Sequence, residues 1–259
     1  MGKVITIVNQ KGGVGKTTTA INLAASLALA EEDILIIDTD PQGNSTSGLG
    51  IARDDLDRSL YDVYSGKCEI KDALKMTAID HLNVLPSTID LLGVEVELVE
   101  KEGRESFLNK AINSIRDRYR YIFIDCPPSL GLLTLNALVA ADSVIIPVQC
   151  EYYSLEGLGL LTRTLRFVRS SFNPNLEIEG IVLTMFDPRN NLSQEVASEV
   201  RKHFGDKVYN TIIPRNVTLG EAPSYGKPAL LYDVRSKGAQ SYLSLAKEIL
   251  NENGVRQRA

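Results

Sequence analysis

A glycine-rich segment at residues 11–18, with the sequence Lys-Gly-Gly-Val-Gly-Lys-Thr-Thr, constrains this chain more than any other feature. It follows an apolar, β-branched run at residues 4–8 and opens a helical pattern at residues 17–30. In such an order, backbone N–H groups of the turn and the positive end of the helix dipole converge on one point. The segment therefore predicts an anion cradle, suited to phosphate, at the end of a strand.

The side chains of this segment fit a phosphate loop that binds a nucleoside triphosphate with Mg²⁺. Lys16 is placed to neutralise the β- and γ-phosphates, and the Thr17 hydroxyl to hold Mg²⁺. The usual pattern begins with a glycine, but this chain has Gln10 there, and a second lysine, Lys11, precedes the two glycines. The predicted nucleotide-binding residues of the loop are Lys11, Gly12, Gly13, Val14, Gly15, Lys16, Thr17 and Thr18.

Apolar runs alternate with helical patterns along most of the chain. Most runs are continuous Val, Ile and Leu, which is typical of strands covered on both faces of a parallel sheet. The alternation predicts right-handed βαβ units and an α/β fold with a doubly wound, mostly parallel sheet flanked by helices. We expect strands at residues 3–9, 34–38, 82–86, 121–125, 143–148, 178–184 and 208–214, and helices at residues 17–30, 106–118, 154–172, 192–204 and 239–253.

Length and composition indicate one domain over residues 1–259, because 44% hydrophobic content is ample for a single packed core. Residues 50–80 are polar and lack a strong period, so we expect an excursion of short helices there rather than a second domain. The chain contains no run of 18 or more apolar residues, so we expect no transmembrane helix. The nucleotide loop begins so near the first residue that a cleaved signal peptide would remove it, so we expect a cytoplasmic protein.

Three aspartates lie at the ends of two predicted strands. Asp38 and Asp40 follow the run at residues 34–37. Because they are two residues apart, their side chains point the same way if the segment is extended. Asp125 ends the run at residues 121–124 and precedes Cys-Pro-Pro. Beside a phosphate loop, one carboxylate can hold the Mg²⁺ water shell and another can orient the attacking water. A turn role in Asp-Pro-Gln-Gly is the alternative for the first pair.

These segments together resemble a known family. The stretches K-G-G-V-G-K-T-T, D-T-D-P-Q-G-N and I-D-C-P-P are similar to motifs of the deviant-Walker-A ATPases, which are P-loop NTPases. Within them the chain resembles the chromosome-partitioning ATPases called ParA or Soj, and residues 209–217, 219–228 and 232–239 resemble the characteristic stretches of that subgroup. The resemblance covers nearly the whole chain and implies an ATPase that uses ATP and Mg²⁺.

The resemblance implies roles for individual residues. Lys11 would reach across an ATP-dependent sandwich homodimer to the phosphates of the partner copy, as an arginine finger does. Asp40 matches the carboxylate tied to hydrolysis, so we predict Lys11, Lys16 and Asp40 as catalytic residues. Thr17, Asp38 and Asp125 are the predicted metal-side residues. The segment expected to pack near the adenine is Pro214, Arg215 and Asn216.

The resemblance also implies non-specific binding of double-stranded DNA by the ATP dimer, on the nucleoid, and release when a ParB-type partner stimulates hydrolysis. The net charge of −5 opposes such binding, but residues 180–259 carry 11 Lys and Arg against 8 Asp and Glu. A local basic face can bind a polyanion, although so small an excess is also ordinary surface solvation. Related sequences often carry arginine at the position of Thr218, so one phosphate contact is expected to be missing. The candidate DNA contacts are Arg189, Lys202, Lys227, Arg235, Lys237 and Lys247.

The sequence argues against three other functions and leaves the role of one helix face open. A membrane-surface ATPase similar to MinD needs an amphipathic C-terminal helix, and residues 253–259 are short and polar, so we expect no membrane partner. An iron–sulfur carrier needs cluster cysteines, and no C-x-x-C pair occurs. A non-enzymatic nucleotide-bound scaffold would not need the intact catalytic residues. Arg163, Arg166 and Arg169 share one helix face, which could meet DNA, the dimer partner or only solvent.

Overall fold

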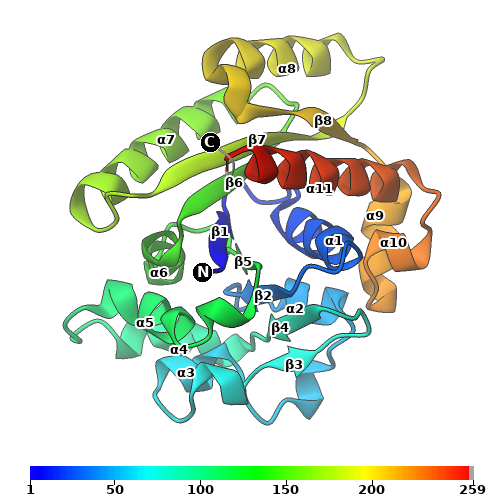
Figure 1. The fold of residues 1–259 in the computed structure, drawn as a ribbon. Coiled ribbons are helices and arrows are strands. Elements are labelled where there is room, and N and C mark those ends of the chain that lie inside the picture. The colour runs from blue at the N-terminus through cyan, green and yellow to red at the C-terminus, as the bar shows by residue number, and fades with distance from the viewer. Residues whose placement is uncertain (257–259) are drawn as a thin grey trace.

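The computed structural model describes residues 1–256, without the side chains of Asp55 and residues 252–256; the end of the polar tail, residues 257–259, lies outside the described residues. The described chain forms an eight-stranded sheet in the order β3-β4-β2-β5-β1-β6-β7-β8 (Figure 1). All neighbouring strands pair in parallel except β3 and β4. The predicted doubly wound, mostly parallel sheet is therefore confirmed. The strands are β1 (Lys3–Ile7), β2 (Ile34–Asp38), β3 (Lys75–Met76), β4 (Leu82–Leu85), β5 (Tyr121–Asp125), β6 (Ser143–Gln149), β7 (Glu177–Phe186) and β8 (Val208–Pro214).

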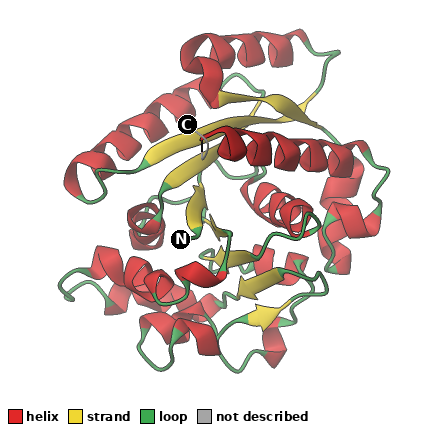
Figure 2. Ribbon diagram, viewed as in Figure 1, coloured by secondary structure: helices red, strands yellow, loops and turns green. Residues whose placement is uncertain are grey.

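Helices cover both faces of the sheet, as Figure 2 shows. Side chains alternate along each strand, so β1 sends Val4 into one apolar cluster and Ile5 into the other. One cluster is completed by α1 (Lys16–Ala28) and α11 (Lys237–Arg256). The other is completed by α3 (Leu60–Tyr64), α4 (Leu92–Glu97), α5 (Phe107–Asn113), α6 (Leu132–Ala140), α7 (Ser154–Ser171) and α8 (Asn191–Phe204).

The structure contains helices that the sequence pattern does not predict. Helix α6, between β5 and β6, is apolar on almost every side, so it shows no helical period, although a parallel β5–β1–β6 arrangement requires a crossover there. Helix α4 and the short helices α2 (Asn44–Gly48), α9 (Val217–Glu221) and α10 (Ala229–Tyr232) also lie where no helix is expected. Residues 50–80 hold α3 and the antiparallel edge strand β3. No helix in the described part is long and apolar enough to span a bilayer.

Candidate nucleotide site

The glycine-rich loop connects β1 to α1 at the carboxyl edge of the sheet. Gly13 and Gly15 have φ angles of 73° and 92°, in the left-handed region that glycine occupies without strain. No side chain caps the first turn of α1. The first N–H groups of the helix therefore keep their hydrogen-bonding capacity and the positive end of the dipole for an anion.

Side-chain hydrogen bonds to the strands β6 and β7 hold this loop in place. The Thr184 hydroxyl, on β7, donates to the carbonyl of Val14 at 2.8 Å, in a buried hydrogen bond. The side-chain amide of Asn9 donates to the carbonyl of Pro147 at 2.7 Å, and its oxygen accepts the N–H of Lys11 at 3.0 Å. Neither Thr184 nor Asn9 is predicted as a site residue. Their only sequence signal is a polar residue at the end of an apolar strand.

Replacing Thr184 should loosen the phosphate loop. Thr184→Val should lower the free energy of unfolding by about 1–3 kcal/mol, because it leaves the buried Val14 carbonyl without its donor. It should also weaken ATP binding, since the carbonyl no longer fixes the loop. Thr184→Ser, which keeps the hydroxyl, is the matched control in urea unfolding and ATP titration. Full stability and affinity of Thr184→Val, with a loss in Thr184→Ser, would show that the methyl packing matters and the hydrogen bond does not.

Lys16 lies at the start of α1 with only 7% of its surface exposed. Its ammonium donates to the carbonyl of Lys11 at 3.1 Å. Burial lowers the pKa of Lys16, while the negative charges of Asp125 and Asp40 oppose that shift. The ammonium thus sits beneath the loop, among carboxylates, where it can move to a phosphate.

Asp38 and Asp125 are register partners on the adjacent strands β2 and β5, and both are fully buried. The N–H and hydroxyl of Thr46 donate to Asp38 Oδ2 at 2.8 and 2.7 Å. The Ser45 hydroxyl donates to Asp125 Oδ2 at 2.7 Å. Burial raises the pKa of both carboxyls, and for Asp38 the charge of Asp125 adds to the rise. Two carboxyls buried on adjacent strands favour a cation between themselves and the loop.

The residues present fit Mg²⁺. Oδ1 of Asp125 is buried and has no hydrogen-bond partner of regular geometry among the described residues. Hydrogen bonding by the nearby Thr17 side chain lowers the pKa of Asp125 and so offsets part of the rise caused by burial. Both oxygens of Asp38, in contrast, accept hydrogen bonds, from the Asp40 N–H at 3.2 Å and from Thr46. No group of three His, Cys, Asp or Glu residues in the described part could hold a metal alone, so phosphate oxygens and water would complete the ligand set.

Two cavities meet at the loop. The first, of about 370 Å³, is lined by the loop residues Gly12, Gly13, Gly15, Lys16, Thr17 and Thr18 and by Asp40, Gln42, Asn44, Pro128 and Met185. The second, of about 210 Å³, is lined by Pro214, Arg215, Asn216 and Tyr242, and shares Gly15, Thr18 and Met185 with the first. The structure thus brings Asp40 to the phosphate side. It places the segment predicted to lie near the adenine in the adjoining cavity.

Comparison with known proteins agrees with this geometry. A family model described as an AAA domain matches residues 2–178. The sporulation initiation inhibitor protein Soj of Bacillus subtilis (strain 168) is 56% identical over 96% of this chain and 98% of its own length. The chromosome partitioning protein ParA of Caulobacter vibrioides (strain NA1000 / CB15N) is 54% identical over 98% of this chain and 96% of its own. This chain belongs to the ParA/Soj family of chromosome-partitioning ATPases.

Solved structures related to this chain share its fold, and one of them contains a nucleotide analog with magnesium. A Mycobacterium smegmatis protein described as cobyrinic acid a,c-diamide synthase, with a bound ATP analog and magnesium, is 36% identical with a TM-score of 0.84, covering 96% of this chain and 95% of its own. The cell-division ATPase MinD of Pyrococcus furiosus is 31% identical with a TM-score of 0.80, covering 97% and 99%. These structures confirm the P-loop ATPase fold.

Lys11 of the ParA/Soj protein makes an ion pair within its own chain. Its ammonium lies 3.0 Å from the Glu151 carboxylate, with 35% and 48% of the two side chains exposed. Glu151 also accepts a hydrogen bond from the Gln149 side chain at 2.6 Å. Lys16 lines the first cavity, and Lys11 is not among the lining residues.

The six candidate DNA contacts are all exposed. They fall in three parts of the chain: Arg189 and Lys202 before and in α8, Lys227 before α10, and Arg235, Lys237 and Lys247 before and in α11. Arg189 forms a two-pronged pair with Asp187, at 3.0 and 2.9 Å, which lowers the pKa of Asp187 to about 2. Lys202 lies 3.4 Å from Glu199. On α7, Arg163 and Arg166 border a groove against His203 of α8. The candidates without an ion pair in the described part of the chain are Lys227, Arg235, Lys237 and Lys247.

Proposed function

We propose that this chain is an ATP-dependent DNA-partitioning ATPase, which hydrolyses ATP to ADP and phosphate. The proposal is carried by one observation: a glycine-rich loop with a buried lysine faces a buried pair of carboxyls and the nearby Asp40. Such an arrangement can bind a triphosphate, neutralise its charge and orient water, which is most of what phosphoryl transfer requires of a protein. Proteins use this chemistry for several functions, and the membership of the chain in the ParA/Soj family supports DNA partition.

The roles follow from the positions of the side chains. Lys16 and the N–H groups of the loop bind the β- and γ-phosphates, and Thr17 with Asp125 holds Mg²⁺. Bound Mg²⁺ would neutralise charge that develops on the phosphate oxygens. Asp38 supports the metal side through Thr46 and the backbone at residue 40. Asp40, at the wall of the phosphate cavity, orients the attacking water.

Dimerisation follows from the second lysine. The ion pair between Lys11 and Glu151 is partly exposed, and such pairs contribute at most about 1 kcal/mol. A triphosphate in a partner copy offers several negative charges, so Lys11 can leave Glu151 for it. The homodimer should therefore require ATP in both copies, and the ADP form should separate. A ParB-type partner would stimulate hydrolysis and so release the protein from DNA.

DNA binding by the dimer would depend on phosphate neutralisation. The exposed residues Lys227, Arg235, Lys237 and Lys247 are better candidates than Arg189, whose charge Asp187 already balances. Binding that releases counterions weakens as salt concentration rises, whatever the DNA sequence. The protein would then be associated with the nucleoid in the cytoplasm.

Substitution of Asp40 tests the proposal. Asp40→Ala should lower ATP turnover by about 100-fold or more, because the water loses its orienting group, while ATP binding persists. Asp40→Asn, which keeps an acceptor for the Gln42 N–H, should behave in the same way and so separates hydrolysis from loop structure. The variant should remain on DNA as an ATP-bound dimer.

The measurement is sedimentation of Asp40→Ala with random-sequence DNA, and in parallel with anionic liposomes, in ATP or ADP at two salt concentrations. ATP-dependent, salt-sensitive binding to DNA alone is the expected result. Binding to liposomes but not to DNA would contradict the proposal and indicate a membrane-surface ATPase. Binding to neither would leave an ATPase and remove the DNA function.

A further inference from the structure

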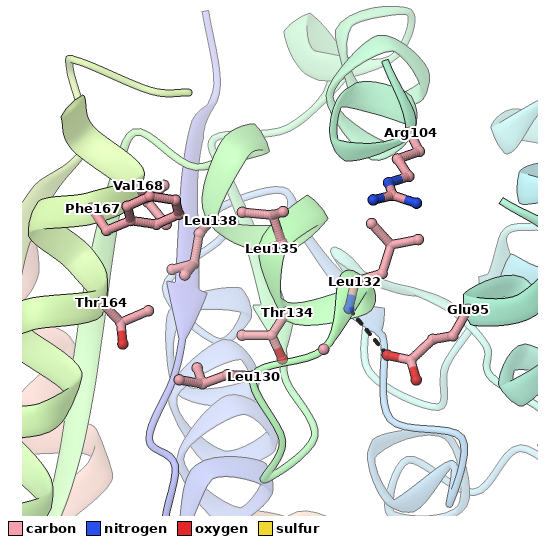
Figure 3. A pocket seen from close by; sticks show the side chains of 11 residues that line it. Glu95, Arg104, Leu130, Leu132, Thr134, Leu135, Leu138, Thr164, Phe167 and Val168 are labelled. Carbon is pink, nitrogen blue, oxygen red and sulfur yellow. Dashed lines mark hydrogen bonds between the residues drawn. The ribbon is translucent and has the colours of Figure 1, made fainter. Parts of the chain in front are cut away.

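An apolar hollow between α6 and α7 lies outside the nucleotide site (Figure 3). It has a volume of about 520 Å³ and shares no lining residue with either nucleotide cavity. Leu135 and Leu138 of α6 face Phe167 of α7 across it, and Leu130 lies at its lower edge in the view. Phe167 keeps 60% of its surface exposed. A large aromatic side chain exposed beside an apolar hollow is typical of an interface rather than of a free surface.

The opposite wall of the hollow belongs to a segment with a net negative charge. Residues 90–105, here called the acidic strip, contain six acidic and two basic residues, a net charge of −4. Glu95 and Arg104 of the strip line the hollow, and the Arg104 guanidinium donates to the carbonyl of Val99. Val96 and Val99, between the acidic residues, are exposed. The surface thus combines apolar contact area with negative charge.

A short loop joins the hollow to the phosphate cavity. Pro128 lines the phosphate cavity, and Leu130, two residues later, lines the hollow. Glu95 accepts the N–H of Leu132, the first residue of α6, at 3.1 Å. A side chain on Gly131 would collide with the Glu95 carboxylate in this position, so Glu95 would have to move. A ligand that pairs with Glu95 or presses on Leu130 therefore acts on the loop that borders the phosphates.

We propose that the hollow and the acidic strip bind a basic segment of the ParB-type partner, which inserts a large apolar side chain between α6 and α7. This inference rests on the proposed function and names the docking surface through which hydrolysis is stimulated. The charge of the strip selects the occupant. It repels DNA phosphates, and a symmetric contact between two copies that is centred on the strip would place strip against strip. A positively charged protein segment is attracted instead, and the loop at residues 126–131 carries its effect to the phosphate cavity.

Two matched pairs of variants test the surface. Phe167→Glu should raise the partner concentration for half-maximal stimulation of ATP turnover by about 10-fold or more, as loss of an aromatic anchor does. Leu160→Glu, on the same helix with 51% exposure but outside the hollow, should leave this partner concentration unchanged.

Glu100→Lys in the strip reverses one attractive charge. It should raise the partner concentration for half-maximal stimulation about threefold or more at low salt. The exposed Glu177→Lys, outside the strip, should have no effect.

The assay measures ATP turnover by the full chain against increasing ParB-type partner, with thermal melts of every variant. Basal turnover, ATP-dependent dimerisation and DNA binding should match the unsubstituted protein. Stimulation of Phe167→Glu equal to that of Leu160→Glu would overturn the inference and leave the proposed function intact. If the unsubstituted protein is not stimulated, the partner role in the proposed function fails, and this inference with it. Loss of dimerisation or of DNA binding in Phe167→Glu alone would assign the hollow to a second copy or to DNA, and would overturn the inference.

Discussion

Lys16→Ala should weaken ATP binding by a factor on the order of 10²–10³, the largest loss we expect from a single substitution. Truncating one partner of a buried, hydrogen-bonded charge pair costs about 2–5 kcal/mol, and each 1.4 kcal/mol is tenfold. Lys16 meets these conditions, because only 7% of it is exposed and its ammonium lies under the loop. Without it, the triphosphate would face the carboxylates of Asp38, Asp40 and Asp125 with one positive charge fewer.

Calorimetric titration with ATP and Mg²⁺ measures this loss directly. A second readout is thermal stability, since a ligand at 100 times its Kd stabilises the native state by about 2.7 kcal/mol. ATP should therefore raise the melting temperature of the unsubstituted protein but not of Lys16→Ala. Lys75→Ala, in the edge strand β3, removes a lysine away from the site and should retain full affinity. An affinity of Lys16→Ala within threefold of the unsubstituted protein would contradict the assignment of Lys16.

The strands could be predicted from the sequence because burial on both faces leaves continuous apolar runs, such as residues 34–37 before Asp38. The same burial conceals α6, whose residues Leu132–Ala140 are apolar on almost every side and so show neither period nor polar face. The short helices α2, α9 and α10 have four or five residues each, too few for a periodic pattern. Burial on all sides thus makes a strand recognisable in the sequence as a continuous apolar run, but it removes the periodic pattern by which a helix is recognised.

Prediction of the site divides in a similar way. The loop residues and Asp40 lie in contiguous motifs, so a phosphate loop with a carboxylate nearby can be predicted from the sequence. The particular roles of Lys11 and Asp40 come from the family resemblance. The hydrogen bond from Thr184 to Val14 joins residues 170 positions apart, and that from Ser45 to Asp125 joins residues 80 apart. Such contacts depend on strand order, which a single sequence does not display. Both Asp38 oxygens accept hydrogen bonds, whereas Oδ1 of Asp125 has no partner of regular geometry among the described residues. This difference between the two aspartates is visible only in three dimensions.

Lys11→Ala should separate nucleotide binding from dimerisation. We expect its affinity for ATP to stay within about threefold of the unsubstituted protein, because Lys16 and the loop N–H groups remain. ATP-dependent dimers should disappear at micromolar protein, and DNA binding with them, since the charge supplied to the partner's phosphates is gone. Analytical ultracentrifugation in ATP and in ADP measures the dimer, and DNA sedimentation measures its consequence.

The Lys11–Glu151 ion pair offers the control that makes this result specific. Lys11→Ala removes both the intermolecular charge and the ion pair, whereas Glu151→Gln removes the ion pair and keeps Lys11. If Lys11 acts on the partner copy, Glu151→Gln should dimerise on ATP at least as well as the unsubstituted protein, because the lysine is no longer held in its own chain. If the ion pair itself shapes the dimer surface, both variants should fail alike. Normal ATP-dependent dimerisation of Lys11→Ala would exclude the sandwich arrangement for this chain.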